Sequence, residues 1–228
     1  MSRGFDSISY NQELLLCLLM EAGVGTLAFD WAKPHHVCTL TGVPVWTNLA
    51  NDLTVLNFTP GNPDYLLTAA AGATDLDFTT GDFAGACWIR PDALGNRNIC
   101  THGVHLADGW FWELGGTGQM RLYTNQAAAV QTTIASEDVV VDVWQFVAFS
   151  RTGAAVTLSL NGVANVETAA VHIDPVTAAA RNFYVGVNNA AGAAWYDGDL
   201  WNLRVWGKAI TTAQFKSMWE RERHYFNV

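Results

Sequence analysis

The sequence predicts an all-β protein, a two-sheet antiparallel sandwich with one short helix near its C-terminal end. Strand-like segments recur along the 228 residues, and turns rich in Gly, Pro, Asn and Asp separate them. The clearest segment, residues 200–206, alternates Asn202 and Arg204 with aromatic and branched residues, which is typical of a strand half buried in a sheet. Helical spacing is confined to residues 211–223. Many short strands followed by one late helix indicate a sandwich.

The expected strands follow one another with tight turns between them. Residues 60–63 and Asn161–Gly162 are turns by composition, and residues 151–153 join a hairpin. The expected strands are residues 13–21, 27–30, 38–40, 45–47, 53–58, 64–68, 83–90, 99–102, 110–113, 120–123, 130–134, 144–150, 156–160, 183–187 and 200–206. No repeat indicates a propeller or a solenoid, and no linker divides the chain. We therefore expect an N-terminal arm at residues 1–12 and a single domain at residues 13–228.

The expected helix begins at Thr211, which has capping-box spacing with Gln214. Phe215, Met218 and Trp219 then recur at helical spacing and form one apolar stripe. We expect this stripe to cover the core at a sheet edge, and a groove for a partner is the alternative.

Composition and charge exclude several classes of partner. Half of the residues are hydrophobic and 14% are charged, so the chain can bury a large core. A net charge of −9 repels phosphate backbones and anionic membranes, which argues against nucleic acid as a partner. No stretch approaches the roughly 18 consecutive apolar residues of a membrane span, so we expect no membrane insertion.

The apolar run at residues 14–20 resembles the core of a signal peptide in length. Glu13 precedes it, Glu21 follows it, and no basic cluster lies before it, so we expect a buried strand instead. The chain then carries no visible export signal, and its location stays open.

The four cysteines have no spacing typical of a zinc site. Two of them, Cys17 and Cys87, lie in apolar segments that read as strands. Without an export signal to indicate an oxidising compartment, we expect free, buried thiols. The cysteines are Cys17, Cys38, Cys87 and Cys100.

Four segments, taken in chain order, resemble the strands of one fold family. Phe83–Pro91 resembles its "F-T-x-x-x-W-[VI]-[KR]-P" strand, and residues 144–148 resemble its "W-x-h-V-A" strand, where h is apolar. Residues 156–162 resemble its "h-x-L-Y-x-N-G" hairpin, and residues 195–211 its closing "G-x-h-x-x-h-R-h-[WY]-x-x-A-L-[ST]" segment. Together they resemble the laminin-G-like, concanavalin-A-like lectin and glucanase jelly rolls. The compact form and the Arg-Gly-Phe-Asp start resemble members encoded by bacteriophages and prophages.

This resemblance implies a sandwich that binds sugars, proteins or surfaces, often with one structural calcium ion. The first Asp ligand of the family corresponds to Asp30. The second belongs to a turn that here reads Phe58–Thr59–Pro60–Gly61, and the third falls on Trp201. Because Ca²⁺ takes roughly 6–8 oxygen ligands with carboxylates among them, we expect no metal and no cofactor.

Some relatives are glucanases, whose catalysis needs two carboxyl groups roughly 5–10 Å apart. Glu113 is the best single acid, but the sequence offers it no partner. Glu137–Asp138 reads as a solvated turn. His35–His36 could be a metal pair or a base, but neighbours on a strand point in opposite directions, so we expect histidines of a surface turn instead. We therefore expect a protein that is not an enzyme.

Ten tryptophans and six tyrosines are more than a core of this size needs. Aromatic faces stack on sugar rings and anchor protein interfaces. Asp108–Gly109 and Asp197–Gly198 each set a tight turn beside an aromatic pair, so we expect those rings at a loop-bearing edge, with core packing as the alternative. The candidate ligand-binding residues are Trp110, Trp112, Tyr123, Trp195, Tyr196, Asn96, Arg97, Asn188 and Asn189.

Two functions from different classes fit these observations. The first is a non-catalytic lectin-like module that recognises a glycan or a protein surface in adhesion. The second is a structural virion protein, such as a capsid decoration, tail or fibre component, that uses the jelly roll for protein–protein contacts and homo-oligomer or virion assembly. The fold alone does not choose between them.

Overall fold

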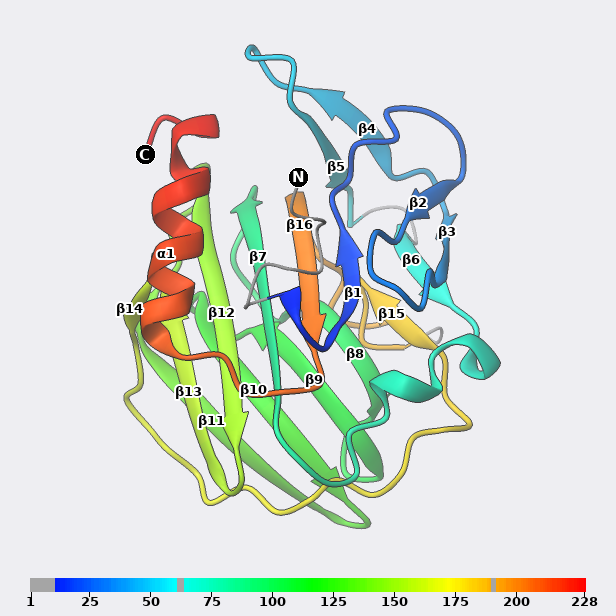
Figure 1. Ribbon diagram of the computed structural model, residues 1–228, viewed down its shortest axis with the longest axis vertical. Coiled ribbons are helices and arrows are strands. Elements are labelled where there is room, and N and C mark those ends of the chain that lie inside the picture. Colours follow the sequence, from blue (N-terminus) through cyan, green and yellow to red (C-terminus); the bar gives the residue numbers. More distant parts are fainter. Residues whose placement is uncertain (1–10, 61–63, 190–191) are drawn as a thin grey trace, which may run out of the picture.

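The computed structural model describes residues 11–60, 64–189 and 192–228. The predicted arm at residues 1–12 lies almost entirely outside the described residues. The described chain forms two antiparallel sheets packed face to face, with one α helix on the outer side of the first (Figure 1). The predicted two-sheet sandwich with one late helix is confirmed. No described helix has the length and apolar character that a membrane crossing requires.

Sheet A contains eight strands, with β1 paired to β16 beside the main path. In spatial order that path is β14 (Val163–Ala164), β13 (Ala155–Leu160), β12 (Gln145–Thr152), β7 (Phe83–Pro91), β16 (Gly198–Trp206), β5 (Thr54–Phe58) and β4 (Val45–Asn48). The expected strand at 13–21 is β1 (Leu14–Leu18). The apolar run that resembled a signal peptide is thus part of a sheet.

Sheet B also contains eight strands and carries the site described below. In spatial order they are β11 (Ala129–Asp138), β10 (Gln119–Gln126), β9 (Asp108–Leu114), β8 (Arg97–Val104), β15 (Phe183–Val185), β6 (Tyr65–Thr68), β3 (Val37–Thr41) and β2 (Leu27–Phe29). Two short 3₁₀ helices, η3 (Ala70–Gly72) and η4 (Thr74–Leu76), connect β6 to β7.

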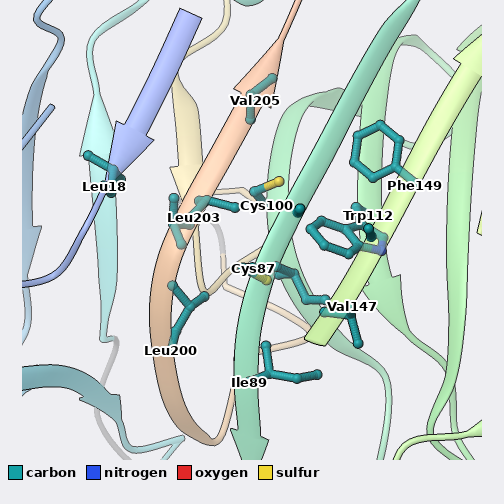
Figure 2. Close-up of a cluster of buried hydrophobic side chains, with 14 of the residues drawn as sticks. Leu18, Cys87, Ile89, Cys100, Trp112, Val147, Phe149, Leu200, Leu203 and Val205 are labelled. Atoms are coloured by element: carbon teal, nitrogen blue, oxygen red, sulfur yellow. The ribbon is translucent and has the colours of Figure 1, made fainter. Parts of the chain in front are cut away.

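Strand β16 lies in the middle of sheet A, between β7 on one side and both β1 and β5 on the other. Its pairing with β7 shifts between Trp201 and Arg204, where Asn202 has a φ of 54°. This bulge reverses the phase of the strand. Simple alternation predicted Leu200, Asn202 and Arg204 on one face, and this is wrong, because Leu200 and Leu203 both point into the core (Figure 2).

The core fills the space between the sheets with apolar side chains from both. Figure 2 shows a cluster of these side chains, with Leu200 and Leu203 from sheet A and Cys100 and Trp112 from sheet B among them. All four cysteines are buried and free, as predicted. Burial raises the pKa of both Cys17 and Cys38 to about 12, so these thiols stay protonated and act as small apolar groups. The tryptophans assigned to the core are buried: Trp88, Trp144, Trp201 and Trp206.

Helix α1 (Thr212–Glu222) covers part of the outer face of sheet A, near β13 and β14, and η5 (Arg223–Tyr225) follows it (Figure 1). The capping box predicted at Thr211 and Gln214 is present in both directions. Phe215 and Met218 are buried against the sheet, which confirms that the apolar stripe covers the core. The strands that it contacts, β13 and β14, are the last two at one edge of sheet A.

Candidate ligand-binding site

A pocket of about 420 Å³ opens on the outer face of sheet B. Its floor comes from β9 and β10, where Phe111 pairs with Tyr123 and Glu113 pairs with Arg121. These four side chains share the outer face because their neighbours Trp110, Trp112 and Leu114 point into the core. The described residues that line the pocket are Asn96, Gly103, Val104, His105, Phe111, Glu113, Arg121, Tyr123, Asn188, Asn189, Ala193 and Ala194.

Aromatic rings form one half of the floor. The rings of Phe111 and Tyr123 stack with centroids 4.3 Å apart and an interplanar angle of 19°. His105, in the turn between β8 and β9, presents its ring edge-on to both, at 5.8 Å from Phe111 and 6.2 Å from Tyr123. Such cross-strand aromatic contacts hold the rings in fixed positions, so the pocket offers a preformed aromatic surface.

Charged and polar groups form the other half of the floor. The Tyr123 hydroxyl donates a hydrogen bond to Glu113 Oε1 at 2.8 Å, and Arg121 Nη1 lies 4.0 Å from the same oxygen. Burial raises the pKa of Glu113, although Tyr123 and Arg121 oppose the shift. Burial and the neighbouring Glu113 raise the pKa of Tyr123 to about 12. The phenol is therefore a hydrogen-bond donor and not an activated nucleophile.

One wall of the pocket comes from the loop after β15. Ala194 O accepts a hydrogen bond from Asn98 N at 2.8 Å, and Trp195 O accepts one from Arg97 Nη1 at 3.0 Å. The Trp195 ring packs against Gly192, where an added Cβ would come within 2.5 Å of the ring, and lies 6.0 Å from the Tyr65 ring. These contacts hold the described part of the loop against sheet B.

The structure brings four of the predicted site residues to this pocket. Asn96, Tyr123, Asn188 and Asn189 line it, although they come from three separate parts of the chain. Arg97 and Trp195 do not line it; they support its loop wall, as described above.

The surface location predicted for three other candidates is wrong. Trp110, Trp112 and Tyr196 are fully buried. Trp110 Nε1 donates to Leu76 O at 2.9 Å, and the Tyr196 hydroxyl donates to Asp199 O at 3.1 Å. The turns at Asp108–Gly109 and Asp197–Gly198 begin β9 and β16, so the aromatic residues beside them belong to packed strands. The alternative of core packing holds for these rings.

Sequence reasoning missed His105, Phe111 and Arg121 as pocket residues and valued Glu113 only as a lone acid. The alternation of inward and outward residues along β9 could have revealed them. Once Trp110 and Trp112 are assigned to the core, Phe111 and Glu113 must face outward. Tyr123, which was predicted, then marks the matching outer row on β10.

The residues at the family calcium position do not fit a calcium ion. Asp30 Oδ1 accepts hydrogen bonds from the backbone N–H groups of Cys17 and Ala32, and Oδ2 accepts from the His36 backbone. The His36 ring also bridges Asp30 and Asp75, at 2.6 Å and 2.8 Å. Nitrogen donors thus surround both oxygens of Asp30. Because a cation would repel the hydrogen atoms of these donors, the carboxylate offers no cation site. His36 was predicted at the surface, and this is wrong, because it is buried.

The fold and the pocket define a concanavalin-A-like jelly roll with a preformed recess on one sheet. A family model described as the Concanavalin A-like lectin/glucanases superfamily, Laminin_G_3, matches residues 61–215. The chain belongs to this family. Among curated protein sequences, none matches the chain.

Several solved structures share the fold at low identity. A structure of botulinum neurotoxin type C, whose cell entry depends on two ganglioside molecules, has a TM-score of 0.71 and 12% identity over 93% of this chain and 52% of that one. The binding domain of botulinum neurotoxin DC, in complex with rat synaptotagmin II, has a TM-score of 0.67 and 10% identity over 92% of this chain and 52% of that one. This chain therefore spans about half the length of these neurotoxin chains.

A third structure matches over nearly its whole length. Domain 4 of AbnA, a GH43 extracellular arabinanase from Geobacillus stearothermophilus in complex with arabinotriose, has a TM-score of 0.64 and 16% identity over 90% of this chain and 98% of that one. At these identities the likeness concerns the fold.

Proposed function

We propose that this protein is a non-catalytic binding module that holds a sugar unit of a glycan in the pocket on sheet B. The observation that carries the proposal is the composition of the pocket, in which a stacked aromatic pair lies beside side-chain amides, a carboxylate and a guanidinium. A sugar ring has an apolar face that packs on aromatic rings and hydroxyl groups that need donors and acceptors at its edge.

The size of the pocket suits one small unit of a ligand. Its volume of about 420 Å³ falls within the range of roughly 300–1,000 Å³ that is typical of small-molecule sites. Asn96, Asn188 and Asn189 surround it with amides that both donate and accept hydrogen bonds. The walls thus offer polar partners around an aromatic floor.

The pocket lacks the pair of acids that glycoside hydrolysis uses. Of the described residues that line it, Glu113 is the one carboxylate, and the general mechanism requires two. The raised pKa of Tyr123 gives no substitute nucleophile. We infer that the pocket binds its ligand without transforming it.

The solved structures support this role by analogy alone. One was solved with arabinotriose, one was described with gangliosides and one with a protein receptor. A protein surface is therefore the second class of ligand to test. Nothing in the described residues or in these comparisons favours the alternative role as a structural virion protein.

A glycan array, followed by titration calorimetry with the best binder, tests the proposal. Asn96→Ala and His105→Ala remove exposed groups at the rim, so the fold should survive while binding weakens by roughly 1–3 kcal/mol for each group that contacts the ligand. Glu137→Gln, an exposed position outside the pocket, is the matched control and should bind as the unmodified protein does. Absence of any bound glycan, or binding that both rim variants leave unchanged, would refute the assignment of this pocket.

A further inference from the structure

We propose that the pocket takes a neutral sugar, and that Glu113 and Arg121 hold two adjacent hydroxyl groups of its ring; this rests on the function proposed above. The two residues lie directly opposite each other on β9 and β10. They are the charged residues among those described that line the pocket, apart from His105, which is charged only when protonated.

Glu113 and Arg121 face each other without forming a closed ion pair. Arg121 Nη1 lies 4.0 Å from Glu113 Oε1, which is beyond hydrogen-bond distance. The Arg121 side chain is 26% exposed, so part of its guanidinium stays accessible at the pocket. The carboxylate accepts a hydrogen bond from Tyr123, and an ionised carboxylate has room for several more. Donor and acceptor capacity is thus left open at the floor of the pocket.

Two neighbouring hydroxyl groups of a sugar ring match the open hydrogen-bond capacity of Glu113 and Arg121. A carboxylate can only accept hydrogen bonds and a guanidinium can only donate them, whereas a hydroxyl group does both. One hydroxyl group can donate to Glu113 while the next accepts from Arg121, as the rest of the ring packs against Phe111 and Tyr123. Hydrogen bonds that involve an ionised group are stronger than those between neutral groups, so this pair would supply much of the affinity.

The same pair discriminates against acidic sugars. The charges of Glu113 and Arg121 balance, so a ligand carboxylate brought to Arg121 would face the carboxylate of Glu113 in a poorly solvated place. A neutral ring meets no such repulsion. A glucoside should therefore bind more tightly than the glucuronide of the same stereochemistry.

The proposal also sets the direction of the pH dependence. Three titratable groups face Glu113: Arg121 and Tyr123 from β10, and His105 from the turn between β8 and β9. The other elements beside it, β8 and the loop after β15, contribute only neutral amides, those of Asn98, Asn188 and Asn189. Burial raises the pKa of Glu113, so its ionised form is lost at a higher pH than for an ordinary glutamate. Binding should weaken as the pH falls through that raised value.

Matched methyl glycosides, glucose with glucuronic acid and galactose with galacturonic acid, test the proposal by calorimetry. In the unmodified protein the neutral member should bind more tightly. Glu113→Gln keeps an oxygen for the Tyr123 hydroxyl, so the melting temperature should hold, while neutral affinity drops about 10- to 100-fold and the gap to the acidic member narrows. Glu137→Gln should change neither value. Titration of the unmodified protein against pH gives a second readout, and Glu113→Gln should remove the weakening of binding at low pH.

The outcomes separate this inference from the function on which it rests. If a neutral sugar binds, and Asn96→Ala weakens it but Glu113→Gln does not, the pocket remains a sugar site and the role of Glu113 is refuted. Tighter binding of the acidic member by the unmodified protein also overturns the inference. If none of the four glycosides and no array glycan binds, the sugar-binding function fails and the inference fails with it.

Discussion

Trp110 shows at the scale of one residue where the aromatic content of this chain is used. Its ring is fully buried and contacts four other aromatic rings, those of Phe78, Phe83, Phe149 and Phe183. Trp110→Ala should therefore lower the free energy of unfolding by about 3–5 kcal/mol, because it leaves a large cavity. Denaturant unfolding measures this. Trp31→Ala is the control, since that ring is 51% exposed; equal midpoints for the two variants would show that Trp110 does not pack as described.

His172 makes the stability of the fold depend on acid. The ring lies buried between the hydroxyl groups of Thr124 and Thr133, at 2.9 Å from each. Burial, assisted by Arg151, lowers its pKa from 6.5 to about 4. Between these two values the unfolded chain binds more protons than the folded one, so stability should fall as the pH drops from 6.5 towards 4.

Unfolding midpoints measured across this pH range test the effect of His172. His172→Gln keeps a polar side chain at the site but cannot be protonated, so the decline of stability over this range should be shallower in the variant. An identical decline in both proteins would assign the acid sensitivity to other groups.

At the scale of an element, the C-terminal end of α1 is bound to sheet A through one carboxylate. Glu222 accepts hydrogen bonds from Trp88 Nε1 at 2.8 Å, from Asn202 Nδ2 at 3.2 Å, and from Arg204 Nη1 and Nη2 at 2.9 Å and 3.0 Å. The bulge at Asn202 turns Arg204 to the outer face of the sheet, where it meets the helix. The irregularity in β16 is thus what allows this connection.

Glu222→Ala should cost about 3–5 kcal/mol of stability, because it leaves the nearly buried guanidinium of Arg204 without its partner. Glu220→Ala, on the exposed side of the same helix, should change stability little. Adding Arg204→Met to Glu222→Ala should recover part of the loss, since the unpaired charge is then gone. Equal melting temperatures for the Glu222 and Glu220 variants would contradict the role given to this contact.

At the scale of the whole molecule, we predict that the fold does not depend on calcium. The donors around Asp30 are N–H groups and the ring of His36, which occupy the carboxylate. Thermal unfolding with added calcium and with a chelator should give the same melting temperature. A cation bound to the folded state would add about 2.7 kcal/mol at a hundredfold excess over Kd, so a clear rise with calcium would defeat this prediction.

The sandwich could be predicted from the sequence because alternation, turn residues and the capping box are local signals. Alternation defines two faces of a strand but does not say which face is inward. Trp110 and Trp112 in β9 were therefore assigned to the wrong side, and the bulge at Asn202 changed the phase of β16. Four of the twelve described lining residues were found, namely Asn96, Tyr123, Asn188 and Asn189. Phe111, Glu113 and Arg121 required the register of β9 against β10, which depends on contacts between distant parts of the chain.

The central place of β16 in sheet A bears on how the protein can be made. This strand joins β1, β5 and β7, yet it follows all three in the chain. While a ribosome is still extending the chain towards residue 198, those three strands have open edges and apolar faces without their common partner, which favours association between nascent chains. Each pairing also requires a long loop to close, and the entropy cost of this closure comes before any stabilising contact between the strands has formed. This sheet can therefore be completed only after residues 198–206 have been synthesised, and until then β1, β5 and β7 lack the strand that joins them.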